Sequence, residues 1–449
     1  MERRTSNGRG WRSVTAALLV LAALAGALTG RSVQAQETEI TFSFWGDPAE
    51  ERAYQRVIDE FETANPDIEV RAVYTPGQGE YQTKLATDFG AGNPPDVFLI
   101  NYRRYGQFAA SGALEPLESR LNESETIALE DFYEAPIEAF RYRGGELSCI
   151  PQNVSSLVVY YNVDLFNRYG VPLPRDGWTW DDFTNAAVAL TVDLNDDGAP
   201  DQRGVGVEAS FIRYAPFIWM NGGEIVDDVD NPTELTLDTP EALAAIEWFI
   251  GLGFTNHNVV PTEAEVLALD DETRFMNGTT AMLLQSRRVV PTLREGIRDF
   301  QWDVVSLPVP ASGERASILH SDAFCLAAES EDKDAAWRFI EFAVGPTGQT
   351  TLAQTGRTVP SLKAVAESEV FLGSGIEGVG IAAAPANARV FLDTIPDIRR
   401  VPNISTWIEV EDAWNTAFKR AFYVELDIEG AIDVVEFRAR DAFERAVDE

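Results

Sequence analysis

The chain of 449 residues carries 72 acidic and 36 basic side chains, which gives it a formal net charge of −36 at pH 7. We do not expect so acidic a chain to bind nucleic acid or anionic lipid, because both repel negative charge. With 45% hydrophobic residues, among them 10 Trp, 12 Tyr and 25 Phe, the chain has enough apolar surface to form two cores.

Residues 1–35 have the layout of a signal peptide. Four arginines within the first twelve residues precede an Ala/Leu-rich run from Val14 to Leu28, and small residues follow at Val33 and Ala35. We therefore expect export to the periplasm or the extracellular face of the membrane, with cleavage of this segment. No cysteine lies near its end, so a lipid anchor on a cysteine is not expected. The Arg3-Arg4 pair leaves twin-arginine export as the alternative to general secretion.

Strands and helices are predicted to alternate from there on. Apolar residues alternate with small polar ones over residues 40–44 and predict a strand that ends at Trp45. A helix is predicted over residues 49–64. Ligands of open α/β sheets bind beyond the carboxyl ends of strands, so Trp45 is placed where a ligand would lie. A plain core position is the alternative for this residue.

The same alternation continues along the chain. A second strand is predicted at 68–73 and a helix at 80–89, and the apolar run 96–100 is typical of a buried parallel strand. A helix is predicted over 104–111, and the next strand at 157–162. These elements predict the α/β class.

The chain has two cysteines, Cys149 and Cys325, each within a segment that reads as a short strand. In an exported protein two cysteines are expected to pair. Such a bond would close a loop of about 175 residues, worth roughly 4 to 5 kcal/mol in the chain-entropy model. Two buried free thiols are the alternative.

Ten segments in a fixed order resemble those of the extracellular solute-binding proteins of ABC sugar transporters, the group of maltose-binding and glycerol-3-phosphate-binding proteins. The resemblance covers essentially the whole chain after residue 35. No single segment is very specific, but their number and order are. The segments are Trp45 and residues 65–70, 95–98, 150–153, 160–162, 177–183, 219–224, 275–282, 302–308 and 335–340.

The resemblance implies the type II fold of periplasmic binding proteins, in which two α/β lobes, each a mixed sheet flanked by helices, enclose a ligand cleft. Residues 37–150 and 322–365 would form the first lobe, and residues 151–321 and 366–449 the second. The chain would cross near Pro151, near Ser321 and again between Leu362 and Pro385. Cys149 and Cys325 would then be neighbours beside the hinge on the first lobe.

The resemblance also implies a carbohydrate ligand and a membrane permease as partners, with the chain acting as a monomer and requiring no cofactor. Glycerol 3-phosphate or a polyol is the alternative ligand. Sugars need aromatic faces for their C–H surfaces and short polar side chains for their hydroxyls. The residues placed at strand ends, at crossings or where relatives contact sugar are Trp45, Gln78, Asn101, Tyr102, Gln152, Asn153, Ser155, Trp219, Ser286, Arg288, Arg357 and Trp407.

Two of these candidates carry a qualification. Trp219 lies in a segment that is apolar on all sides, which favours the core. Arg288 stands close to the place where maltose-binding relatives have a stacking tryptophan. This difference argues against a long maltodextrin, and an arginine there suits an acidic sugar, a phosphate or a pair of hydroxyls.

A further segment has oxygen ligands in the spacing of a calcium loop: Asp193, Asn195, Asp197 and Asp201 occupy positions one, three, five and nine. The twelfth position is Gly204, where such loops have a bidentate glutamate. An acidic turn without metal is the alternative, and it is the preferred interpretation.

The sequence does not favour an enzyme. His257 and His320 are the only histidines, and neither has metal-binding or catalytic-triad spacing. A secreted glycosidase that uses two carboxylates is the alternative from a different functional class.

Overall fold

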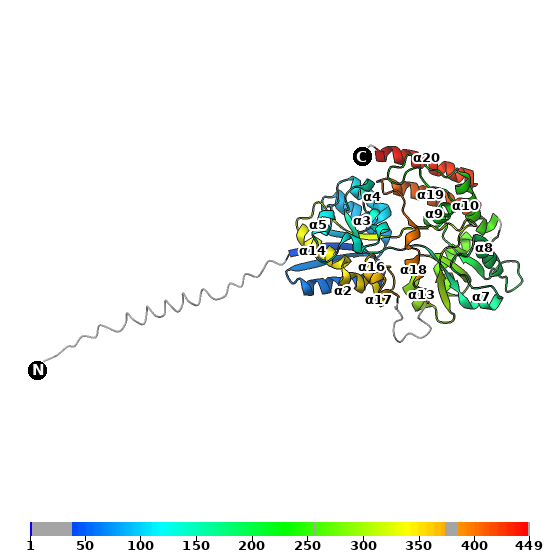
Figure 1. Cartoon of the computed structure of the whole chain (residues 1–449), viewed down its shortest axis with the longest axis horizontal. Helices are drawn as coiled ribbons and strands as arrows, with labels where there is room; N and C mark the ends of the chain where they lie inside the picture. Colours follow the sequence, from blue (N-terminus) through cyan, green and yellow to red (C-terminus); the bar gives the residue numbers. More distant parts are fainter. Residues whose placement is uncertain (2–37, 256, 373–384, 448–449) are drawn as a thin grey trace.

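The computed structural model describes residues 1, 38–255, 257–372 and 385–447. The predicted signal peptide and the middle of the predicted third crossing lie outside these residues. Two mixed β-sheets, one in each of two lobes that lie side by side, organise the described chain (Figure 1). The predicted two-lobed α/β fold is confirmed, whereas the exact lobe boundaries stay a prediction.

The first-lobe sheet has the strand order β2-β1-β3-β10-β4, with β1 parallel to β2 and β3, and β10 antiparallel to β3 and β4. Its strands are β1 (Thr38–Trp45), β2 (Ile68–Thr75), β3 (Val97–Asn101), β4 (Cys149–Pro151) and β10 (Asp322–Leu326). Helices α3 and α14 pack against it. The helices of this part are α2 (Pro48–Ala64), α3 (Gln78–Gly90), α4 (Tyr102–Ala110), α5 (Glu118–Glu123), η1 (Leu129–Asp131), α6 (Glu134–Glu138), η2 (Tyr142–Gly144), α14 (Lys333–Val344), α15 (Pro346–Ala353), α16 (Lys363–Ala366) and α17 (Glu369–Leu372).

Local sequence explains how the first helix begins. The Asp47 side chain accepts hydrogen bonds from the backbone N–H groups of Ala49 and Glu50, and Glu50 accepts one from Asp47 N in return. This reciprocal cap satisfies N–H groups that have no partner within the helix. Behind it, Tyr54 and Phe61 are buried on one face of α2. Capping and apolar spacing therefore fix both the start and the orientation of α2.

The second-lobe sheet has the order β6-β7-β5-β8, with β6 parallel to β7, and β5 antiparallel to β7 and β8. A separate two-stranded sheet pairs β9 with β11. The strands are β5 (Val158–Asn162), β6 (Arg203–Gly206), β7 (Thr280–Gln285), β8 (Trp302–Val305), β9 (Ser317–Ile318) and β11 (Ile398–Arg399). The helices are α7 (Val163–Tyr169), α8 (Trp180–Ala189), α9 (Phe211–Met220), α10 (Pro240–Ile250), η3 (Gly251–Thr255), α11 (Glu263–Ala268), α12 (Asp271–Met276), η4 (Arg287–Val289), α13 (Val290–Gly296), α18 (Val390–Asp393), η5 (Ile395–Asp397), α19 (Trp407–Phe422) and α20 (Ile428–Val447).

The chain leaves the first sheet after β4 and returns to it at β10, and these two strands pair with Cys149 opposite Cys325. The two residues form a disulfide with a Cα–Cα distance of 4.4 Å. The predicted pairing is confirmed, and it cross-links the strands that lead into and out of the second lobe.

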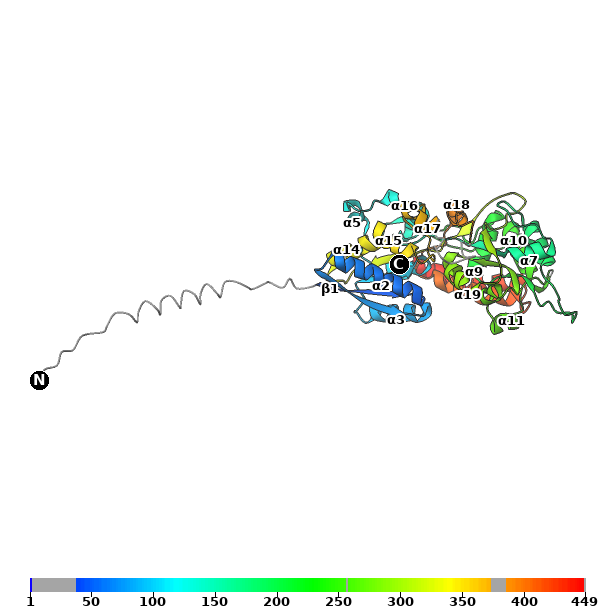
Figure 2. The same cartoon turned by 90° about the horizontal axis from the view of Figure 1, so that it is seen from below.

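Helix α19 lies at the boundary of the two lobes, where it packs against α4 of the first lobe, α9 of the second and α20 (Figures 1 and 2). Trp407 and Trp414 of α19 meet the ring of Phe211 edge-on at 5.6 and 5.2 Å. None of the helices in the described ranges is both long and apolar enough to cross a membrane.

Candidate ligand-binding cleft

A cavity of about 230 Å³ lies between the lobes, bounded by side chains from both and from the crossing segments. Nine of the candidate ligand-binding residues predicted from the sequence line this cavity. They are Trp45, Gln78, Asn101, Gln152, Asn153, Ser155, Ser286, Arg288 and Arg357. Segments far apart in the sequence thus meet in one place.

The first-lobe wall has one aromatic face. The Trp45 ring lies 4.8 Å from the ring of Tyr81, which is buried and donates its hydroxyl proton to the backbone carbonyls of Ser43 and Leu99. These two hydrogen bonds hold the Tyr81 ring in place, and the ring in turn packs against Trp45. Trp45 itself is half-buried and borders the cavity, as a stacking residue needs to.

A buried carboxylate ties three segments together at the floor of the cavity. Asp322 Oδ1 accepts a hydrogen bond of 2.9 Å from Asn101 Nδ2, and the Asp322 backbone N–H donates to Asn153 Oδ1 at 2.8 Å. Burial raises the pKa of Asp322. Beside it, Ser155 and His320 exchange backbone hydrogen bonds between the two crossing segments. The amides at the floor are thereby held in fixed orientations.

Arg357 connects the two lobes across the cleft. Its Nη1 lies 2.9 Å from Asp47 Oδ2, its Nε lies 2.6 Å from Glu50 Oε1, and Nη1 also donates to the backbone carbonyl of Arg288 at 3.2 Å. Burial raises the pKa of Glu50, although Arg357 opposes that change. The bond to Arg288 joins a first-lobe side chain to the second lobe.

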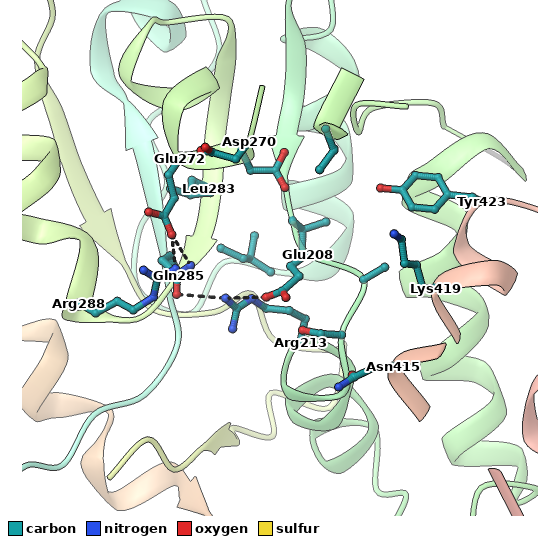
Figure 3. A pocket seen from close by; sticks show the side chains of 16 residues that line it. Glu208, Arg213, Asp270, Glu272, Leu283, Gln285, Arg288, Asn415, Lys419 and Tyr423 are labelled. Carbon is teal, nitrogen blue, oxygen red and sulfur yellow. Dashed lines mark hydrogen bonds and ion pairs between the residues drawn. The ribbon is translucent and has the colours of Figure 1, made fainter. Parts of the chain in front are cut away.

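The second-lobe wall is charged (Figure 3). Arg213 of α9 donates from Nη2 to Gln285 Oε1 at 3.1 Å and lies 3.5 Å from Glu208 Oε2. Gln285 Nε2 donates to Glu272 Oε1 at 3.0 Å, and the same oxygen accepts a hydrogen bond from Arg288. Glu208, Arg213, Gln285 and Arg288 border both the interlobe cavity and a second cavity of about 550 Å³ beside α19, and Glu272 lines only the second one.

Three predicted residues lie elsewhere, and the structure corrects their expected positions. Tyr102 is fully buried because α4 begins directly after Asn101, two residues earlier than predicted, and turns the tyrosine into the first-lobe core. Trp219 is 4% exposed at the end of α9, with the Arg399 guanidinium 5.0 Å from its ring centre. Trp407 is the first residue of α19 and is fully buried, with its ring against that of Phe211.

The cavity also has lining residues that the sequence reasoning missed: Glu50, Tyr54, Leu99, Arg103, Glu208, Ile212, Arg213, Gln285, His320, Asp322 and Thr358. For Arg213 the sequence did contain a signal of a functional site. Arg213 is the single charged residue of the otherwise apolar segment 211–220. A buried charge among apolar neighbours points to a site. Tyr54 and Leu99 lie in segments whose apolar pattern predicted core positions, and the charged and polar residues among the others had no sequence signal that distinguishes them from surface residues.

The acidic loop is closed by its own hydrogen bonds. Asp193 accepts from the backbone N–H of Gly198 at 2.7 Å, Asn195 Oδ1 from that of Asp197 at 2.9 Å, and Asp201 from that of Leu194 at 2.8 Å. Within the described ranges, no group of three or more His, Cys, Asp or Glu residues is arranged to hold a metal ion. The calcium hypothesis is not supported, and the acidic turn accounts for the segment.

The sequence pattern of the family described as "Bacterial extracellular solute-binding protein" matches residues 45–350. The chain belongs to this family. A binding protein of Brucella abortus is 24% identical over 82% of this chain and 84% of its own length. The sn-glycerol-3-phosphate-binding periplasmic protein of Shigella dysenteriae is 24% identical over 72% and 75%.

The fold has solved counterparts. The ABC substrate-binding protein Lmo0181 of Listeria monocytogenes, in complex with cycloalternan, superposes with a TM-score of 0.79 at 24% identity, over 92% of this chain and 99% of that one. As a solute-binding protein, the chain is a carrier and not an enzyme, so the glycosidase alternative is dropped.

Proposed function

We propose that this solute-binding protein captures a carbohydrate between its lobes and delivers it to the permease of an ABC importer. The observation that carries the proposal is the interlobe cavity, where the aromatic face of Trp45 lies among amide and charged side chains of both lobes. Such a lining suits a ring with apolar faces and a rim of hydroxyls. Cycloalternan, the ligand named for one structural relative, supports this class, and sn-glycerol 3-phosphate, named for a sequence relative, represents the alternative.

The size of the cavity favours a small ligand. About 230 Å³ is below the ~300 Å³ at which typical ligand pockets begin. A monosaccharide or a comparably small derivative would fill it, and the adjoining cavity beside α19 offers room for an extension.

We expect the ligand to favour closure of the two lobes, because residues of both lobes line the cavity. A ligand that touches Trp45 on one lobe and Arg213 or Gln285 on the other makes its full set of bonds only when the lobes are together. It therefore shifts the population toward the closed form. The closed form would be the one that docks on the permease, after export directed by residues 1–35.

The test is a ligand screen on the protein lacking residues 1–35, with monosaccharides, disaccharides, polyols and sugar phosphates. A ligand at 100 times its dissociation constant is expected to add about 2.7 kcal/mol to the free energy of unfolding. Small-angle scattering should show compaction, and the ligand should be recovered unchanged. Cleavage of a glycoside without compaction would contradict the proposal.

A further inference from the structure

Arg213 differs from its surroundings in burial and charge. Its side chain is 2% exposed, and it projects from a helix whose neighbouring residues are mostly apolar and buried. Arg213 lines both the interlobe cavity and the cavity beside α19. Figure 3 shows its side chain in the second of these cavities, next to Glu208 and Gln285.

The charge of Arg213 is poorly compensated by the protein. Its carboxylate partner is Glu208 at 3.5 Å, and the Glu208 side chain is 64% exposed to solvent. Gln285, the hydrogen-bond partner, is neutral. The other three arginines of the interlobe cavity each have a closer carboxylate, in the pairs Arg357 with Glu50, Arg103 with Glu411, and Arg288 with Glu272.

The pKa values of Arg103 and Arg213 reflect this difference in how close the nearest carboxylate lies. For Arg103, burial opposes the charge, but Glu411 outweighs it and raises the pKa. For Arg213, burial dominates and lowers the pKa to about 10. A buried cation without a close anion is costly, which is why such groups are usually paired.

Two donors of Arg213 are also unused. Its Nε and Nη1 are shielded from bulk water and have no hydrogen-bond acceptor among the described residues. A buried donor without an acceptor costs on the order of 1 to 3 kcal/mol. The two free donors lie on different edges of the planar guanidinium, and each can donate to an oxygen of a carboxylate or a phosphate.

We propose that the carbohydrate taken up by this protein carries an anionic group, a carboxylate or a phosphate, and that Arg213 binds it. This inference rests on the proposed function and adds the ligand class. The sugar ring would face Trp45, and its charged group would lie against Arg213.

The experiment is calorimetric titration of the wild-type protein with matched pairs of ligands. The acids are D-glucuronate, D-galacturonate, D-glucose 6-phosphate and sn-glycerol 3-phosphate, and their neutral counterparts are D-glucose, D-galactose and glycerol. At least one acid is expected to bind more than about tenfold tighter than its counterpart. Uronate and phosphate arms distinguish the two anionic groups.

Three variants separate recognition from stability. Arg213→Gln should lose the preference for the acid, and Arg213→Lys should retain part of it because the charge remains. Arg203→Gln is the matched control, since Arg203 is 5% exposed in the same lobe but pairs with Glu265 outside the cleft. That variant should keep the preference of the wild type even where its thermal unfolding temperature falls.

Three results would overturn the inference. If neutral sugars bind as tightly as their acids, the ligand class is wrong while the proposed function stands. If a folded Arg213→Gln variant still binds the acid more tightly than its neutral counterpart, another residue binds the anionic group. Failure of every sugar, charged or neutral, to bind or to compact the protein would instead reject the proposed function, and the inference with it.

Discussion

The two walls of the cleft are built in different ways. The first-lobe wall carries the aromatic Trp45 and the amides of Gln78 and Asn101, at or just beyond the carboxyl ends of parallel strands. The second-lobe wall is formed by the charged side chains of Arg213 on α9 and Arg288 on η4 and by the amide of Gln285 at the end of β7, while the large aromatics nearby, such as Trp407, are core. The aromatic face of the cavity therefore belongs to the first lobe, whereas charged side chains come from both lobes.

The largest expected effect is on stability, and it concerns Trp407, the buried tryptophan behind the second-lobe wall. Trp407→Ala should lower the free energy of unfolding by about 3 to 5 kcal/mol, because a fully buried tryptophan leaves a large cavity. Denaturant unfolding measures it. A mild loss of stability combined with a loss of ligand binding would show that Trp407 belongs to the cleft after all.

The next effect concerns a cross-link that only the first lobe has. Replacing both Cys149 and Cys325 with Ser should cost about 2 to 4 kcal/mol, because the disulfide restrains the unfolded chain across a sequence separation of 176 residues. Thermal unfolding with and without reductant gives the same comparison in the wild type. Unfolding that is insensitive to reductant would contradict the expectation.

A smaller effect is expected at the stacking face. Trp45→Ala should weaken sugar binding by more than about 1 kcal/mol and leave the fold intact, because the side chain is half-buried at the cavity edge. Titration calorimetry measures the affinity, with Trp180→Ala as the control for a half-buried tryptophan outside the interlobe cavity. A loss of stability without a loss of affinity would make Trp45 a core residue.

The smallest effect concerns Asp271 of α12, which lines the adjoining cavity beside α19. Burial raises the pKa of Asp271 from 3.8 to about 6, so the folded state holds more protons than the unfolded state between these two values. Its contribution to stability is therefore present at low pH and is lost as pH rises toward 6. Asp271→Asn should stabilise the protein by about 1 kcal/mol at pH 7, and the gain should shrink as pH falls toward 4. A gain that does not vary with pH would exclude titration of Asp271 as its cause.

Local signals explain what could be predicted. The helix expected over residues 49–64 is α2, Pro48–Ala64, because its cap and its apolar spacing are both local in the sequence. The strand expected over 40–44 extends to Thr38–Trp45. Gln78 and Asn101 were predicted as ligand contacts because they follow strands, and both line the cavity, since parallel strands end at one edge of a sheet.

The same reasoning failed where a helix sets the direction of a side chain. Tyr102 follows a strand as Asn101 does, but it begins α4 and points into the core. Trp219 was a candidate from its position before a loop, although its apolar surroundings favoured the core, and Trp407 was placed by similarity to relatives. Both are buried, Trp219 against Arg399 and Trp407 against Phe211. A shift of one or two residues in where a helix begins changes which side chain faces a ligand.

The sequence by itself determined the class of fold and the order of the elements, because periodicity and capping are local features of the chain. The segments that resemble solute-binding proteins are likewise local, and the cysteine count predicted the disulfide with free thiols as the alternative. Only the tertiary structure decided which polar side chains share a cavity and how their charges are balanced. Arg213 shows the reason: its partners Glu208 and Gln285 lie on different elements, so its incomplete compensation exists only once the chain has folded.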